Sequence, residues 1–85
     1  MLNINNGTKT IIRRLLTRRY IGGKHTEENH IFQWMSHLPS KEGSGVLDEW
    51  KMLINEGFIL RSKKTGEYHI SLNPRKLKEL YELIK

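Results

Sequence analysis

Hydrophobic residues in the first two thirds of the chain recur with the spacing of amphipathic helices. Residues 8–20, 26–38 and 46–56 each place their apolar side chains on one face of a helix, as its period of about 3.6 residues requires. Thr8 and Thr26 are typical N-cap residues for the first two helices, and glycine or proline follows each of the three segments. A short stretch of small and polar residues separates the second helix from the third. The pattern predicts three helices, the last two joined by a turn.

Beyond residue 57 the hydrophobic period changes to two, which indicates β-strands. Residues 58–61 predict one strand, and the alternating apolar residues in 68–72 predict a second. The polar residues 62–66 between them, with a glycine near the end, are typical of a hairpin loop. Asn73-Pro74 then predicts the start of a last helix, because proline is favoured at the first helical position.

Three helices, two strands and a final helix, in this order, are the arrangement of a winged helix-turn-helix domain. We expect a mainly α-helical fold with a small antiparallel β-hairpin, formed as a single domain by residues 8–85 after a flexible N-terminus at residues 1–7. The third helix would be the recognition helix, and Lys63–Thr65 the tip of the wing. With 85 residues the chain has room for one core, since a domain of this size buries only about 60% of the surface of its unfolded chain.

Composition narrows the chemistry that this domain can perform. Cysteine is absent, which excludes disulfides and thiolate metal ligands. The four histidines have no i, i+4 pairing, so we expect no metal ion and no cofactor. Neither a nucleophile elbow nor a phosphate-binding glycine loop is present, which predicts no enzyme activity and no small-molecule substrate. No apolar run reaches the length of a membrane span and no signal pattern opens the chain, which favours a cytoplasmic protein without a membrane partner.

The net charge of +6 is unevenly distributed along the chain. Residues 1–25 carry six basic residues and no acidic one, and residues 58–85 carry seven basic and three acidic residues. Residues 26–57, in contrast, carry six acidic and two basic residues. Lysine and arginine near phosphates release condensed counterions, which favours a nucleic-acid partner for a small basic protein.

Three segments resemble parts of small archaeal winged-helix proteins: GKHTEE (residues 23–28), LINEGFIL (53–60) and TGEYHISLNPR (65–75). The resemblance covers roughly residues 10–85. A helix that ends in the middle segment before a hairpin is common to many winged-helix transcription regulators, whereas HISLNPR (69–75) is more distinctive. The resemblance implies a winged-helix fold and DNA binding, and it implies no particular ligand, operator or catalytic residue.

We expect the chain to bind double-stranded DNA, as a transcription regulator whose affinity is mainly electrostatic and only weakly sequence-specific. The wing supplies cations with the reach that phosphate contact needs, although lysine at a hairpin also protects a strand edge from pairing. The first helix and the entry of the third add phosphate contacts, and the third helix offers two base readers. RNA stays open as the polymer, because basic patches bind both. The predicted contacts are Arg61, Lys63 and Lys64 in the wing, Arg13 and Arg14 in the first helix, Lys41 and Ser44 before the third helix, and Lys51 and Asn55 within it.

The third helix also supports a different function. Asp48, Met52 and Glu56 form an i, i+4, i+8 row opposite its apolar face. Phosphates would repel this carboxylate row, and a methionine exposed between acids is suited to protein contact. The alternative prediction is a protein-interaction winged-helix module that uses this acidic face.

The last helix predicts a homodimer. Its apolar arc is wider than one small domain usually covers, and Leu80, Leu83 and Ile84 are the expected interface residues. A two-fold dimer would double the basic surface. In the alternative interpretation these residues close the domain's own core.

Overall fold

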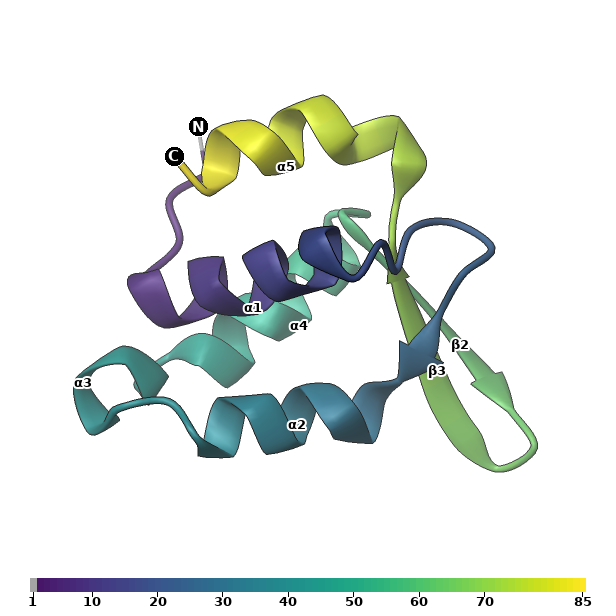
Figure 1. Ribbon diagram of the computed structural model, residues 1–85, viewed down its shortest axis with the longest axis horizontal. Helices are drawn as coiled ribbons and strands as arrows, with labels where there is room; N and C mark the ends of the chain where they lie inside the picture. The colour runs from purple at the N-terminus through teal and green to yellow at the C-terminus, as the bar shows by residue number, and fades with distance from the viewer. Residues whose placement is uncertain (1) are drawn as a thin grey trace.

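The computed structural model describes residues 2–85 as a mainly helical protein with a small three-stranded antiparallel sheet (Figure 1). The strands lie in the order β1-β3-β2, an arrangement compatible with a winged-helix layout. Along the chain the elements are α1 (Asn6–Thr17), β1 (Thr26–Glu27), α2 (Glu28–Ser36), α3 (Ser40–Gly43), α4 (Val46–Asn55), β2 (Ile59–Lys64), β3 (Glu67–Leu72), the 3-10 turn η1 (Pro74–Lys76) and α5 (Leu77–Leu83).

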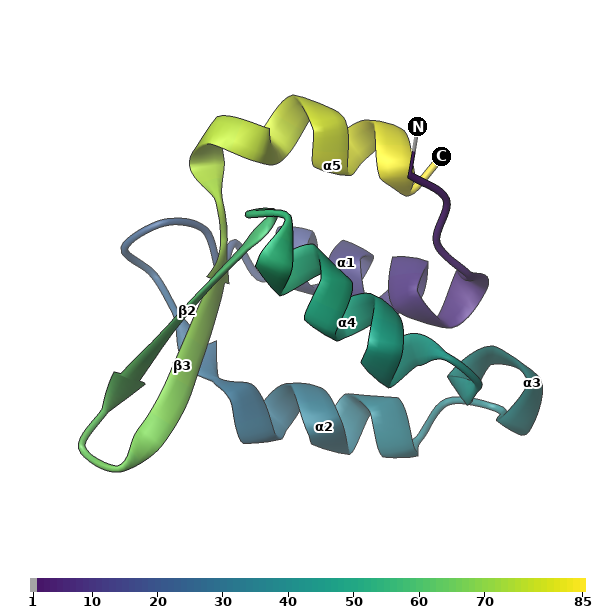
Figure 2. The ribbon, with the colours of Figure 1, turned by 180° about the vertical axis from the view of Figure 1, so that it is seen from behind.

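The helices α1 and α4 pack against one another. Their outward faces lie on opposite sides of the molecule (Figures 1 and 2). Figure 1 shows α1 in front of α4, and the reverse view in Figure 2 shows α4 in front. Both views place α5 along one end of this pair, α2 along the other, and the β2–β3 hairpin beyond the helices. The edge strand β2 contacts α4. The solvent faces of α1 and α4 therefore point in different directions, and the hairpin's β2 edge lies on the α4 side.

Every major element contributes to one hydrophobic core. The indole of Trp50 is the largest fully buried side chain, and its removal from water is among the main stabilising contributions of α4. The other core residues that are at most 2% exposed are Ile11, Ile12 and Leu15 of α1, Ile31 of α2, Val46 and Leu53 of α4, Ile59, Ile70 and Leu72 of the sheet, and Leu80 of α5.

The first helix begins earlier than predicted, because its cap is Asn5 rather than Thr8. The Asn5 side-chain oxygen accepts a hydrogen bond of 3.0 Å from the Thr8 backbone N–H. Thr8 lies inside the helix, buried, and donates its hydroxyl to the Glu49 carboxylate. Ile4 is buried in the core, so the region predicted as a flexible end packs onto the domain from residue 4. Gly7 is needed at its position, since a Cβ there would overlap the backbone carbonyl of Glu42.

The second predicted helix is confirmed, but its start at Thr26 is wrong. Thr26 and Glu27 form β1 and pair with Ile70 and His69 of β3, so that α2 begins at Glu28. Two paired residues are too few to produce a period in the sequence. The stretch predicted as a turn before the third helix also contains the short helix α3.

The predicted hairpin is confirmed, with a longer strand and a tighter turn than expected. β2 extends to Lys64, and the turn consists of Thr65 and Gly66 alone. Both residues have positive φ, 47° and 85°, as a two-residue type I′ turn requires. Glycine adopts this conformation readily, whereas a β-branched residue such as threonine does so at an energetic cost.

None of the helices within residues 2–85 combines the length and the apolar character needed to cross a membrane.

Candidate nucleic-acid interface

The outer edge of the hairpin carries the exposed cations that the sequence predicts for the wing. Lys63 and Lys64 end β2 beside the Thr65–Gly66 turn, and both side chains are exposed. The Lys63 ammonium lies 5.9 Å from the centroid of the Tyr68 ring on the neighbouring strand. Within residues 2–85 neither lysine forms an ion pair with a carboxylate. We call Lys63–Gly66 the hairpin tip.

Arg61, predicted with them, is placed differently. Its Nε donates to both oxygens of Glu28 at 3.0 Å, and its Nη2 lies 2.9 Å from Oε1. The Glu28 side chain is only 6% exposed and also accepts a hydrogen bond of 2.9 Å from the Trp50 indole. The hydrogen bond that Arg61 donates to Glu28 raises the pKa of Arg61, and the guanidinium stacks 3.6 Å from the centroid of the Tyr68 ring. Arg61 therefore compensates a buried charge at the hairpin base, leaving the unpaired charge of β2 on Lys63 and Lys64.

The exposed side of α4 includes the two predicted base readers. Lys51 and Asn55 are exposed and, with Phe32 of α2, line a shallow groove of about 240 Å³ that reaches Arg61 at the hairpin base. The groove thus joins this side of α4 to Arg61 of the hairpin.

The acidic row on α4 is only partly as predicted. Asp48 and Glu56 are exposed, but Met52 is half-buried and packs against the core. Glu49 turns toward α1, where it accepts hydrogen bonds from the Asn5 backbone and the Thr8 hydroxyl. The prediction of an exposed methionine is wrong, because the side of α4 that carries Met52 partly faces the core.

The residues before α4 lie far from the hairpin tip. Lys41, in α3, is exposed, and the Ser44 carbonyl accepts a hydrogen bond of 2.9 Å from the Asn5 side chain. Figure 1 shows α3 at the end of the long axis opposite the hairpin. These two predicted contacts are therefore not brought together with Lys63 and Lys64.

The arginines of α1 form a separate surface. The guanidinium carbons of Arg14 and Arg18 lie 5.0 and 5.4 Å from the centroid of the Trp34 ring in α2. Arg13 donates instead to the carbonyl oxygen of Ile84. Since α1 lies on the other side of the molecule from α4 (Figures 1 and 2), the predicted composite of wing, first helix and third helix is divided between two faces.

One of the interface residues predicted on the last helix is wrong. Leu80 is fully buried in the domain core, so it has no surface to offer a second protomer. Leu83 and Ile84 are half-buried and pack against the same core. Leu83 also lines a pocket of about 560 Å³ together with Leu2 and Ile4 of the N-terminal segment. The homodimer stays a prediction that depends on the remaining exposure of α5.

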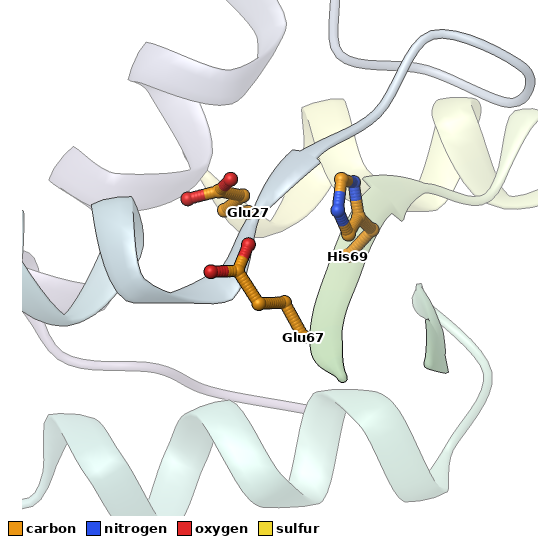
Figure 3. A group of neighbouring side chains, drawn as sticks. All are labelled: Glu27, Glu67 and His69. Carbon is orange, nitrogen blue, oxygen red and sulfur yellow. The ribbon is translucent and has the colours of Figure 1, made fainter. Parts of the chain in front are cut away.

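The sheet carries a cluster of ionisable side chains that the sequence did not predict. Glu27 of β1 and Glu67 and His69 of β3 each place one carboxylate oxygen or ring nitrogen within 4.8 Å of the others (Figure 3). The His25 Nδ1 atom lies 2.8 Å from the Nδ1 atom of His69. Spacing along the sequence does not indicate this cluster, because its members meet across strands.

Neighbouring groups shift the pKa of Glu67 in this cluster and of His25 beside it. A hydrogen bond with Glu27, together with the negative charge of that residue, raises the pKa of Glu67. Desolvation lowers the pKa of His25, and the positive charges of Lys64 and His69 act in the same direction. Two carboxylates therefore share one place on the sheet beside two imidazole rings.

Comparison with known proteins gave no family model, no curated protein and no solved structure that matches the chain. The resemblance on residues 10–85 therefore stays a prediction.

Proposed function

We propose that this chain is a winged-helix protein that binds double-stranded DNA, with the β2–β3 hairpin as its wing and α4 as the helix directed at the duplex. The observation that carries the proposal is the two exposed lysines at the hairpin tip, neither of which forms an ion pair within residues 2–85, at the end of the edge strand β2, which contacts α4. A regulatory or architectural role in transcription follows from such binding.

The affinity comes mainly from phosphate contacts. Lys63 and Lys64 reach beyond the sheet edge, where an ammonium group can follow a phosphate backbone without fixed geometry. The net charge of +6 attracts the duplex from a distance. Each phosphate neutralised by a lysine lowers the slope of log K against log salt by about 0.9.

Sequence readout through α4 is weak. Lys51 and Asn55 are its exposed donors toward base edges, with Lys51 suited to guanine and Asn55 to adenine. Asp48 on this helix and Glu56 directly after it are also exposed, and their carboxylates are repelled by the phosphates that border the major groove. The expected behaviour is salt-dependent binding with modest preference among sequences.

Fluorescence anisotropy with a labelled mixed-sequence duplex, titrated between about 50 and 300 mM salt, tests this proposal. The Lys63→Glu/Lys64→Glu variant should bind much more weakly and flatten the salt slope by about 2. The matched control is Lys78→Glu/Lys85→Glu on the α5 side, which changes the net charge equally but leaves the hairpin intact. Equal losses in both variants, or a flat salt response of the wild type, would contradict a wing contact.

A second candidate function is protein binding at the groove between α2 and α4. Phe32 and Leu47 are 39% and 46% exposed and line this groove beside Trp50, with the exposed acid Asp48 on the same helix as Leu47. Clustered exposed apolar side chains mark interaction surfaces. Charge reversal separates the candidates, because Asp48→Lys with Glu56→Lys should strengthen DNA binding but abolish binding of a basic protein partner.

A further inference from the structure

The strands β1 and β3 bring the side chains of Glu27, Glu67 and His69 together, and His25 lies directly before β1. Glu27 is the direct partner of His69 in the antiparallel register, so their side chains share a face. Glu67 lies two residues before His69 on the same strand and therefore joins them. Figure 3 shows the Glu67 carboxylate directed toward that of Glu27, with the His69 ring on the same strand as Glu67. His25, two residues before Glu27, contacts the His69 ring edge to face at 4.7 Å between centroids.

The two carboxylates face one another without a strong cation between them. Among the described residues 2–85, the one basic group in an ion pair with either is the His30 ring, 3.9 Å from Glu27. Lys64 is the register partner of Glu67 but forms no ion pair with it. Adjacent like charges of this kind are unfavourable. A divalent cation would remove this repulsion.

We propose that Glu27, Glu67 and His69 form a binding site for a divalent transition-metal cation of the zinc type, with His25 as a positioning neighbour. Zinc binds carboxylate oxygen and imidazole nitrogen at about 2.0–2.2 Å in tetrahedral geometry, which places neighbouring ligand atoms about 3.3 Å apart. The present separations of up to 4.8 Å are brought to this value by small torsional changes of the two glutamate side chains. Three protein ligands leave the fourth position to water.

The types of ligand atom at the site favour some metal ions over others. An imidazole ligand favours zinc, nickel or copper over magnesium and calcium, which prefer oxygen alone. A metal-bound histidine generally has a partner at its second ring nitrogen, which fixes the orientation of the ring. The Nδ1 atom of His25 contacts the Nδ1 atom of His69 and serves as this partner. The bound ion would link β1, directly before α2, to β3 of the hairpin, and this function is independent of DNA binding.

Isothermal titration calorimetry of chelator-treated protein with zinc chloride tests the site. We expect one ion per chain, with magnesium chloride giving no comparable binding. His69→Gln and Glu67→Gln should each weaken zinc binding by more than about tenfold, and His25→Phe by about tenfold. The matched control is His37→Gln, which removes an exposed histidine outside the cluster and should leave the affinity unchanged.

Circular dichroism of the metal-free variants shows whether each is folded, and Glu27→Gln replaces Glu67→Gln if that variant is not. In wild-type protein, zinc should shift the NMR signals of the His69 ring and of the β1 and β3 amides. The proposal is overturned if zinc does not bind, if magnesium binds equally well, or if His69→Gln binds zinc like the wild type.

Discussion

Basic residues lie at both the base and the tip of the hairpin, but a carboxylate neutralises only the one at the base. Arg61 and Lys63 are two residues apart on β2, so their side chains emerge on the same face. At the base, Arg61 is held by the buried Glu28, which also binds the Trp50 indole. At the tip, Lys63 has no carboxylate partner within residues 2–85. A basic residue is available to a phosphate only where the fold has not already neutralised it.

The largest expected effect is at the base. Glu28→Ala removes the acceptor of both Arg61 and Trp50, leaving a buried indole N–H unsatisfied and a half-buried guanidinium unpaired. We expect unfolding free energy to fall by about 2–3 kcal/mol, since the one-third exposure of Arg61 moderates the loss. Urea denaturation measures it. Glu56→Ala, at an exposed acid directly after α4, should change stability by less than about 0.5 kcal/mol, and equal effects of the two variants would show that Glu28 stabilises the fold no more than an exposed acid does.

Single substitutions in β2 should separate stability from binding. Lys63→Ala should lower the salt slope of DNA binding by about 0.9 with little change in stability, because it removes one phosphate contact. Arg61→Ala should destabilise the fold but leave the slope unchanged, since Arg61 is engaged by Glu28. Anisotropy and denaturation of both variants provide the comparison. A larger loss of slope in Arg61→Ala would show that the base, too, contacts phosphate.

The sequence predicted these elements better than their contacts. Periodicity was sufficient for α1, α2, α4 and both hairpin strands, and it failed for β1, whose two residues contain no period. Nothing in the sequence around Glu28 indicates its partner, because Arg61 is 33 residues away. In the sequence, Leu80 and Leu83 belong to the same apolar arc. Of the two, Leu80 alone is fully buried, because the packing of the helix on the domain determines which part of the arc contacts the core. The Glu27–Glu67–His69 cluster depends on strand register, which was invisible without β1.

The turn at the hairpin tip offers a smaller effect on stability. Thr65 adopts a left-handed conformation that disfavours β-branched residues. Thr65→Asn should therefore stabilise the protein by about 0.5–1 kcal/mol, since asparagine before glycine is the preferred type I′ sequence. Thermal unfolding measures the change, and DNA affinity should stay constant. A destabilised Thr65→Asn variant would indicate that the threonine side chain stabilises the turn in another way.

The smallest expected effect is a pKa change next to the tip. The pKa of His25 lies below its ordinary value of 6.5 because of desolvation and then the positive charge of Lys64. Lys64→Ala should raise the pKa of His25 partway toward that value, as followed by NMR titration of the ring in metal-free protein. Lys78→Ala serves as the control that changes net charge without changing this neighbourhood. An unchanged pKa in Lys64→Ala would show that the lysine points away from the sheet.

Chemical-shift mapping of the amides during titration with a short DNA duplex at low salt tests the central claim most directly. If the hairpin and α4 form the binding surface, shifts should concentrate at residues 63–66 and near Lys51 and Asn55, with Arg14 and Arg18 on α1 unaffected. Shifts concentrated on the α1 arginines, or no shifts at any residue, would contradict the account.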